Sequence, residues 1–284
     1  MNLIKNIQAQ QLLNLTLLIL ISYLNNKLQI NLANLLPLLI FATATELTIK
    51  KELFIPYSAL ITVLGTVLMI GWLAWYIPYI LIFLALVQKQ YLKIDNKHIF
   101  NPSNFAVIAA LLIFYPKALP IIGEIGKESY IVYIVLFIGT LILIRVDRYL
   151  ISISFLLSYI FLSWLIIGKS DPYWMFSHFL DSLYSTSFIV YILFMLTDPV
   201  TTPSKSLHQI IFGLLVAALA VALNYFIGVR LWHMFIALFL TSIVSIPIYR
   251  KLSTIDYKKF IYTLLFTLTI LVIISLKTPH YFSM

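Results

Sequence analysis

Residues 194–203 read Phe-Met-Leu-Thr-Asp-Pro-Val-Thr-Thr-Pro, a polar stretch between two long apolar segments. Pro199 cannot donate a backbone hydrogen bond, so a helix that arrives from the preceding apolar segment should end here. An Asp or Thr directly before proline is also a typical helix start, and the stretch contains both Asp198-Pro199 and Thr202-Pro203. The stretch therefore predicts a helix end, a short irregular turn, and a new helix from about Pro203.

Apolar residues make up 62% of the 284-residue chain, and charged residues make up 10%. This composition excludes an ordinary soluble domain and indicates an all-α, polytopic integral membrane protein embedded in the lipid bilayer. The net charge of +9 comes from basic residues scattered through short loops, a pattern typical of membrane topology and not of a nucleic-acid groove. The chain contains no cysteine and so provides no disulfide, thiolate metal site or cysteine nucleophile.

A membrane span needs about 20 apolar residues in a helix. By this measure the candidate spans are residues 12–24, 32–49, 58–75, 76–88, 103–116, 130–146, 149–168, 182–196, 207–227, 229–249 and 260–276. Residues 58–88 would be about 46 Å long as one helix, which is too long for an ordinary span. Gly71 and Pro78 offer a turn or kink there. We therefore divide this region and predict 10 or 11 transmembrane helices.

The distribution of basic residues supports this division. With it, thirteen of the 19 Lys and Arg residues fall on one side of the membrane and six on the other, whereas a merged span gives eleven against eight. The positive-inside rule then places the N-terminus in the cytoplasm of a multi-pass protein of the inner (plasma) membrane. No cleavage site follows residues 12–24, so we interpret them as a first span and not as a signal peptide; the total is ten if they do not cross. The loops are short, which predicts a single transmembrane domain over residues 1–284.

A second polar break resembles the first. Residues 97–105 read Lys-His-Ile-Phe-Asn-Pro-Ser-Asn-Phe, again with a capping residue, Asn101, directly before a proline, Pro102, and an apolar helix afterwards. Four spans separate the two breaks, so we expect both at the same, cytoplasmic face. Irregular backbone at membrane depth survives only where protein or a water-lined cavity satisfies its polar groups, and such breaks commonly hold ligands or ions. Ordinary loops and helix caps are the alternative interpretation.

Few ionisable residues lie inside the expected spans. Glu46 lies one helical turn from Lys50. A carboxylate within a span is a functional candidate, and a pair with Lys50 at the membrane interface is the simpler interpretation. No metal-ligand spacing connects the five histidines, and the chain has no glycine-rich phosphate-binding loop. The sequence therefore predicts neither a metal site nor a nucleotide site.

The two proline motifs, about a hundred residues apart, resemble those of the RnfD/NqrB family. These proteins are membrane subunits of the Rnf electron-transport complex and of the sodium-translocating NADH:quinone oxidoreductase. The resemblance runs over about residues 58–250. It implies an integral subunit that carries flavin and passes electrons within a complex that couples redox chemistry to Na⁺ or H⁺ movement. Other redox subunits would supply the electrons, and a quinone is a possible partner.

The sequence departs from the family at the covalent flavin site. Members with covalent FMN carry a Ser-Gly-Ala-Thr type motif after the Asn-Pro helix and attach the cofactor through its threonine. Residues 116–129 occupy that loop here and contain no threonine. The resemblance therefore implies a noncovalent flavin, FMN or riboflavin, and not covalent FMN.

Three functional hypotheses follow. In the first, the chain is a redox subunit, and polar groups of the two breaks line a cofactor site or an ion path. The cofactor-binding candidates are Asn101, Pro102, Asn104, Thr197, Asp198, Pro199, Thr201 and Thr202. In the second, the chain is a solute or ion transporter or a channel on the same scaffold without redox function. In the third, it is a structural subunit whose motifs only cap helices. Whether the chain itself is part of an enzyme, a redox-driven ion translocase, stays open at this point.

Overall fold

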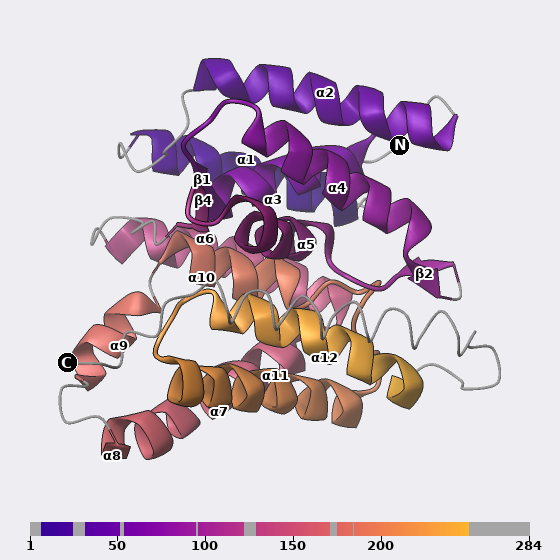
Figure 1. The fold of residues 1–284 in the computed structure, drawn as a ribbon. Helices are drawn as coiled ribbons and strands as arrows, with labels where there is room; N and C mark the ends of the chain where they lie inside the picture. The colour runs from indigo at the N-terminus through magenta and orange to yellow at the C-terminus, as the bar shows by residue number, and fades with distance from the viewer. Residues whose placement is uncertain are drawn as a thin grey trace.

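The computed structural model describes residues 7–24, 32–51, 54–94, 96–121, 129–170, 175–183 and 185–249. These residues form a helical bundle with two short strand pairs (Figure 1). The helices of the first half are α1 (Ile7–Leu24), α2 (Leu32–Lys50), α3 (Tyr57–Met69), α4 (Ile77–Tyr91) and α5 (Pro102–Ala109), which continues into a π-helical turn, η2 (Ala110–Phe114).

The second half begins with α6 (Ser129–Val146). A continuous helix follows, made of α7 (Tyr149–Leu162), π-helical η3 (Ser163–Ile167) and α8 (Gly168–Ser170). The remaining elements are α9 (Phe176–Ser182), α10 (Thr186–Val190), π-helical η4 (Tyr191–Met195), α11 (Ser206–Ile227) and α12 (His233–Tyr249). Strand β1 (Ile70–Trp72) pairs antiparallel with β4 (Ala118–Pro120), and β2 (Lys93–Ile94) pairs antiparallel with β3 (Lys97–His98).

The structure confirms the predicted division of residues 58–88. Helix α3 ends at Met69, strand β1 follows, and α4 starts at Ile77 with Pro78 in its first turn. Lys89 near the end of α4 contacts Ser58 near the start of α3. Since opposite ends of the two helices meet, α3 and α4 run antiparallel.

Helices from both halves of the chain share one apolar core. In the second half α11 packs against α7 and α12, and α12 also packs against α5 of the first half. The rings of Phe100 and Phe239 stack with their centroids 4.2 Å apart. The buried Tyr191 hydroxyl donates to the Met234 carbonyl oxygen at 3.0 Å. These contacts hold the two proline motifs, which precede α5 and α11, in fixed relation.

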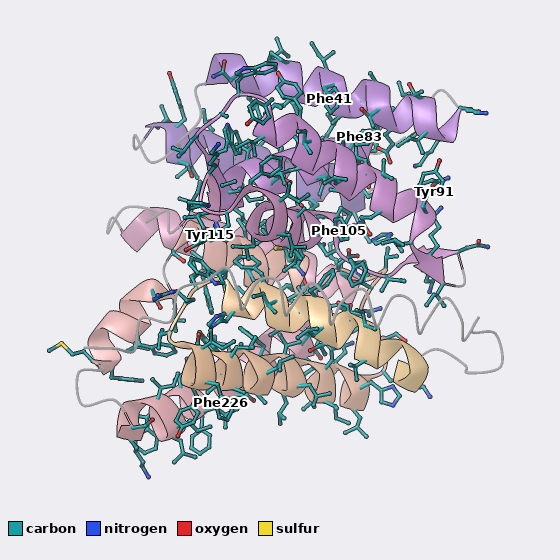
Figure 2. The ribbon with its side chains drawn as sticks, viewed as in Figure 1. Phe41, Phe83, Tyr91, Phe105, Tyr115 and Phe226 are labelled. Carbon is teal, nitrogen blue, oxygen red and sulfur yellow. The ribbon has the colours of Figure 1, made fainter. Side chains whose placement is uncertain are left out.

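Three helices of the described residues are long and apolar enough to cross a membrane. They are Ile7–Leu24, Tyr149–Ser170 and Ser206–Ile227. Shorter apolar helices accompany them, among them α3 and α4. Large apolar side chains such as Phe83, Tyr91 and Phe226 are exposed on the outer faces of these helices (Figure 2). A membrane protein exposes such side chains because lipid, and not water, surrounds it. The chain is therefore a mostly helical membrane protein.

Most predicted spans coincide with a helix, but three details differ. The span expected at 58–75 ends at Met69, where the backbone turns into β1. The helix expected at 182–196 is built from α10 and η4, with Ser185 as its N-cap. The helix expected from Pro203 begins at Ser206, and the intervening backbone forms turns. The last expected span, 260–276, lies outside the described residues.

Candidate functional site

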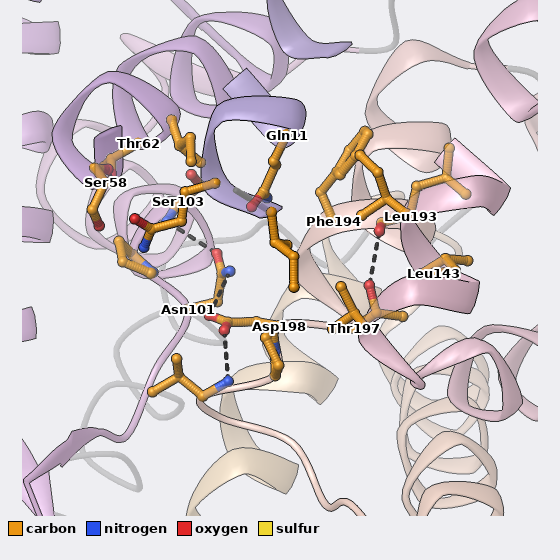
Figure 3. Close-up of a pocket in the computed structure, with 18 of the residues that line it drawn as sticks. Gln11, Ser58, Thr62, Asn101, Ser103, Leu143, Leu193, Phe194, Thr197 and Asp198 are labelled. Atoms are coloured by element: carbon orange, nitrogen blue, oxygen red, sulfur yellow. Dashed lines mark hydrogen bonds between the residues drawn. The ribbon is translucent and has the colours of Figure 1, made fainter. Parts of the chain in front are cut away.

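The two proline motifs meet in the folded chain. The Asn101 side-chain amide donates a hydrogen bond to the Asp198 carboxylate, with 3.1 Å between Nδ2 and Oδ2 (Figure 3). The two breaks are therefore in direct contact, and the membrane face on which they lie stays a prediction. Two segments 97 residues apart therefore form one polar site.

Asn101 acts as the N-cap of α5. Its Oδ1 accepts hydrogen bonds from the backbone N–H groups of Ser103 and Asn104, each at 3.1 Å, and Pro102 occupies the first helical position. The cap prediction from Asn-Pro is confirmed. Since the cap uses Oδ1, the Nδ2 group of the same side chain is left to reach Asp198.

Asp198 holds a tight turn after η4 and does not cap a long helix as expected. Its Oδ1 accepts a hydrogen bond from the Val200 N–H at 3.0 Å. Its carbonyl oxygen accepts the backbone N–H groups of Thr201 and Thr202, as well as the Thr202 hydroxyl at 2.6 Å. Helix α11 starts later, after Lys205, without a side-chain cap. These bonds orient the carboxylate toward Asn101.

His98 is a third member of the site. Its Nε2 lies 3.5 Å from Asp198 Oδ2, and both side chains are largely buried. Burial alone would raise the pKa of Asp198. The hydrogen bond and charge of His98 outweigh it, together with the bonds from Val200 and Asn101, and hold that pKa below its ordinary value. Asp198 is therefore a carboxylate at neutral pH.

A cavity of about 130 Å³, lined by both polar and apolar side chains, opens between the two motifs (Figure 3). Five of the predicted site residues line it: Asn101, Pro102, Thr197, Asp198 and Pro199. Further polar lining comes from other elements: Gln8 and Gln11 of α1, Ser58 and Thr62 of α3, and Ser103 of α5. These latter residues could not be recognised from the sequence, because a single polar residue in an apolar helix carries no local signal of what it faces.

Three predicted site residues do not line this cavity. Asn104 is buried and donates to the Phe235 carbonyl oxygen of α12 at 3.2 Å, so it ties α5 to α12. Thr201 and Thr202 bond the Asp198 carbonyl oxygen and stabilise its turn. Thr197, which does line the cavity, also donates to the Leu193 carbonyl oxygen at 2.8 Å.

A buried ion pair adjoins the cavity. Glu46 of α2 accepts a hydrogen bond from Lys89 at 2.8 Å and lies 3.2 Å from Lys50. The expected Glu46–Lys50 pair is confirmed, but Lys89 is an additional and more buried partner. Lys89 also donates to the hydroxyl of Ser58, which lines the cavity. Nothing in the sequence indicates that Glu46 and Lys89 are in contact, since they meet only when α2, α3 and α4 pack.

The site suits a small ligand better than a flavin. Cofactor pockets commonly measure about 300–1,000 Å³, and this cavity of about 130 Å³ is well below that range. The residues present therefore do not fit an isoalloxazine ring at this position. Among the described residues, no cluster of three His, Cys, Asp or Glu side chains could hold a metal ion. The polar part of the lining, beside apolar side chains such as Leu143 and Phe194, consists of one carboxylate, one imidazole, amides and hydroxyls, which suit water or a single small cation.

Comparison with known protein families gives one match, over part of the chain. The family model described as NQR2, RnfD, RnfE family matches residues 118–246. This region contains the Asp198 motif, while the Asn101 motif precedes it. A comparison with curated proteins found no match. Over residues 118–246, which run from β4 into α12 and make up less than half of the chain, the sequence is similar to the NQR2, RnfD, RnfE family.

Proposed function

We propose that the chain is an integral membrane subunit of an RnfD/NqrB-like electron-transport system and that the cavity between its two proline motifs lies on the path of the transported cation, Na⁺ or H⁺. The observation that carries this proposal is the 3.1 Å bond between Asn101 and Asp198, which joins two helix breaks at the wall of the cavity. Membrane transporters place ion sites at such interrupted helices, where side chains and free backbone groups supply the ligands.

The chemistry of Asp198 supports a cation. A carboxylate has about four lone-pair positions, and protein donors occupy three of them, from Val200, Asn101 and His98. The remaining position and the negative charge are available to a cation. The carbonyl groups and hydroxyls around the cavity would replace part of its hydration shell, as oxygen ligands do for hard cations.

Electron transfer in this proposal uses a noncovalent flavin or a quinone together with redox partner subunits. Such a cofactor would supply the one- or two-electron chemistry. We assign it no position in the Asn101–Asp198 cavity, which is too small for it. Family members belong to multi-subunit membrane complexes, and the partners of this chain would deliver its electrons.

The test is redox-driven cation uptake into membrane vesicles that contain the chain with its partner subunits. Asp198→Asn removes the charge and should lower Na⁺ or H⁺ uptake by about tenfold or more, the change that a loss of about 1.4 kcal/mol in binding gives. The matched control is Asp147→Asn. Asp147 is an exposed carboxylate with φ 54, a conformation that asparagine tolerates.

Two outcomes would contradict the proposal. If Asp198→Asn and Asp147→Asn have equal uptake at equal protein level, the cavity is not on the cation path. If uptake proceeds without any electron donor, the chain is instead a transporter or channel that works without redox chemistry.

A further inference from the structure

The helix that leads to Asp198 ends in the π-helical segment η4, three residues before that carboxylate. The Leu196 N–H donates to the Tyr191 carbonyl oxygen, five residues earlier, at 2.9 Å. In an α-helix this N–H would bond the Ile192 carbonyl oxygen, four residues earlier. A π-helical turn thus contains one residue more than an α-helical turn, and such turns are frequent at functional sites. The extra residue sets the rotation with which the chain enters the Asp198 turn.

Ser152 of α7 supplies the bond that the Ile192 carbonyl oxygen does not receive from Leu196. The Ser152 hydroxyl donates to this oxygen at 2.8 Å. Both residues are buried, and a buried carbonyl group without a hydrogen bond is costly. The Ser152 hydroxyl therefore stabilises the π-helical form of η4.

A second hydroxyl bonds the next carbonyl group of η4. The Thr197 hydroxyl donates to the Leu193 carbonyl oxygen at 2.8 Å (Figure 3). The backbone turns directly after this bond, and the Asp198 carboxylate then reaches Asn101. The position of the carboxylate thus depends on how η4 ends.

Loss of the Ser152 hydroxyl would leave the Ile192 carbonyl group buried and unpaired. The remedy closest at hand is a shift of the Leu196 N–H from the Tyr191 carbonyl oxygen to that of Ile192, which converts η4 into an α-helix. An α-helix turns by about 100° and rises by about 1.5 Å per residue, so the residues after η4 would rotate and advance by about one position. Asp198 would then leave its place beside the side-chain amide of Asn101.

We propose that Ser152 is a positioning residue of the Asn101–Asp198 site: its hydroxyl keeps η4 π-helical and so holds the Asp198 carboxylate against Asn101. Ser152 does not line the cavity and acts only through η4. Its effect on cation movement rests on the function proposed above, whereas its effect on the bond between Asn101 and Asp198 is measured without reference to that function.

The experiment is nuclear magnetic resonance of the purified full-length chain in detergent micelles, with ¹⁵N in the side-chain amides of asparagine. The Asn101 resonance is identified by its absence from Asn101→Ser. Ser152→Ala should move this resonance to the position of water-exposed asparagine amides, because the bond to Asp198 is lost. Ser152→Thr keeps a hydroxyl at this place and should restore the wild-type position.

Two further variants separate positioning from a general loss of stability. Ser152→Cys changes the size of the side chain little and has a weaker donor, so it should move the Asn101 resonance part of the way, and it serves as the test if Ser152→Ala does not fold. The matched control is Ser242→Ala. Ser242 is also buried and donates to a carbonyl oxygen at 2.8 Å, but that oxygen belongs to Leu238 of its own helix, α12. Ser242→Ala should leave the Asn101 resonance unchanged.

Three results would overturn the inference. The first is a wild-type Asn101 resonance in Ser152→Ala and Ser152→Cys. The second is a resonance in Ser152→Thr that moves as far as in Ser152→Ala, because the hydroxyl would then not be the group that matters. The third is an equal movement in Ser242→Ala, because any lost buried hydroxyl would then have the same effect.

Cation uptake into vesicles separates this inference from the proposed function. Uptake should fall in Ser152→Ala to the level of Asp198→Asn and return in Ser152→Thr. If the Asn101 resonance moves as expected but Asp198→Asn takes up as much cation as the Asp147→Asn control, Ser152 positions Asp198 and the proposed function is wrong. If Asp198→Asn loses uptake while Ser152→Ala keeps both the wild-type resonance and the wild-type uptake, the proposed function stands and this inference is wrong.

Discussion

The Asn101 side chain uses its two ends for different purposes: Oδ1 caps helix α5, and Nδ2 donates to Asp198 at 3.1 Å. The first contact is local and structural. The second joins segments 97 residues apart at the cavity wall. Because the two contacts involve different atoms, substitutions can remove them separately.

Asn101→Ala should lose both contacts, whereas Asn101→Ser should keep the cap and lose the bond to Asp198. An N-cap is worth about 0.5–2 kcal/mol, so we expect Asn101→Ala to lower the free energy of unfolding by about that amount and Asn101→Ser by less. Both should impair cation uptake. Ser185→Ala, which removes the cap of α10 through the Phe188 N–H, is the control. Ser185→Ala should lower the free energy of unfolding and leave cation uptake unchanged. Equal cation uptake in Asn101→Ala, Asn101→Ser and Ser185→Ala would show that the bond between Asn101 and Asp198 is only structural.

The depressed pKa of Asp198 predicts acid sensitivity. His98, Val200 and Asn101 outweigh burial and hold that pKa below the ordinary value of 3.8. A carboxylate whose pKa is lower in the folded state stabilises the fold above its unfolded pKa, and the contribution disappears as the pH falls through the folded pKa. Thermal unfolding in detergent between about pH 6 and pH 3 should therefore show a loss of stability below about pH 4. In Asp198→Asn the loss of stability below about pH 4 should be smaller than in the wild type. A dependence of stability on pH equal to that of the wild type would contradict the assignment of this loss to Asp198. Asp147→Asn, which keeps Asp198, serves as the control.

Local rules explain why the two motifs could be found from the sequence. Asparagine or aspartate before proline specifies where a backbone segment stops or starts, whatever surrounds it. The positive-inside count also divided residues 58–88 correctly, since α3 and α4 run antiparallel. The role of Asp198, in contrast, could not be predicted from the local sequence. It holds a turn and not a helix start, because the backbone reaches α11 only at Ser206.

The packing of helices explains what the sequence did not reveal. Glu46 and Lys50 are one turn apart, so their contact was predictable. Lys89 reaches Glu46 only because α2 and α4 pack against each other with particular rotations. The same holds for Asn104, whose side chain points to Phe235 and not to the cavity. Rotation about a helix axis depends on all its neighbours, and nearly uniform apolar segments carry little signal for it.

The absence of cysteine makes the proposed orientation directly testable. Lys205 precedes α11 at the Asp198 end of the bundle, and Lys169 lies in α8 at the far end of the helix that begins with α7; both are exposed. With a cytoplasmic N-terminus, Lys169→Cys should react with a membrane-impermeant maleimide on intact cells. Lys205→Cys should react only after permeabilisation. The reverse pattern would invert the topology and place the Asn101–Asp198 site on the outer face.

Gly213 is expected to be essential for the packing of α11 on α7. A Cβ atom there would lie 2.6 Å from the Ile151 carbonyl oxygen and 2.9 Å from the Phe155 nitrogen, both of which are backbone atoms of α7. Backbone cannot move aside cheaply, so Gly213→Ala should destabilise the chain by about 1–3 kcal/mol in thermal unfolding. Gly65→Ala is the matched control, because its Cβ would meet the Ser103 hydroxyl at 2.7 Å, which can rotate away. If both variants unfold at the same temperature, α7 and α11 are not packed this closely.

Any flavin carried by this chain should be removable without breaking a covalent bond. In the family that the chain resembles, covalent FMN is attached through a threonine of the loop after the Asn-Pro helix, and residues 116–129 have no threonine. The purified chain should show no fluorescent band after denaturing electrophoresis. If its absorption spectrum in mild detergent shows flavin, the flavin should pass into the supernatant on acid precipitation. A flavin that stays with the precipitated protein would show that another residue attaches it. Limited proteolysis and mass spectrometry of the fluorescent peptide would then identify that residue.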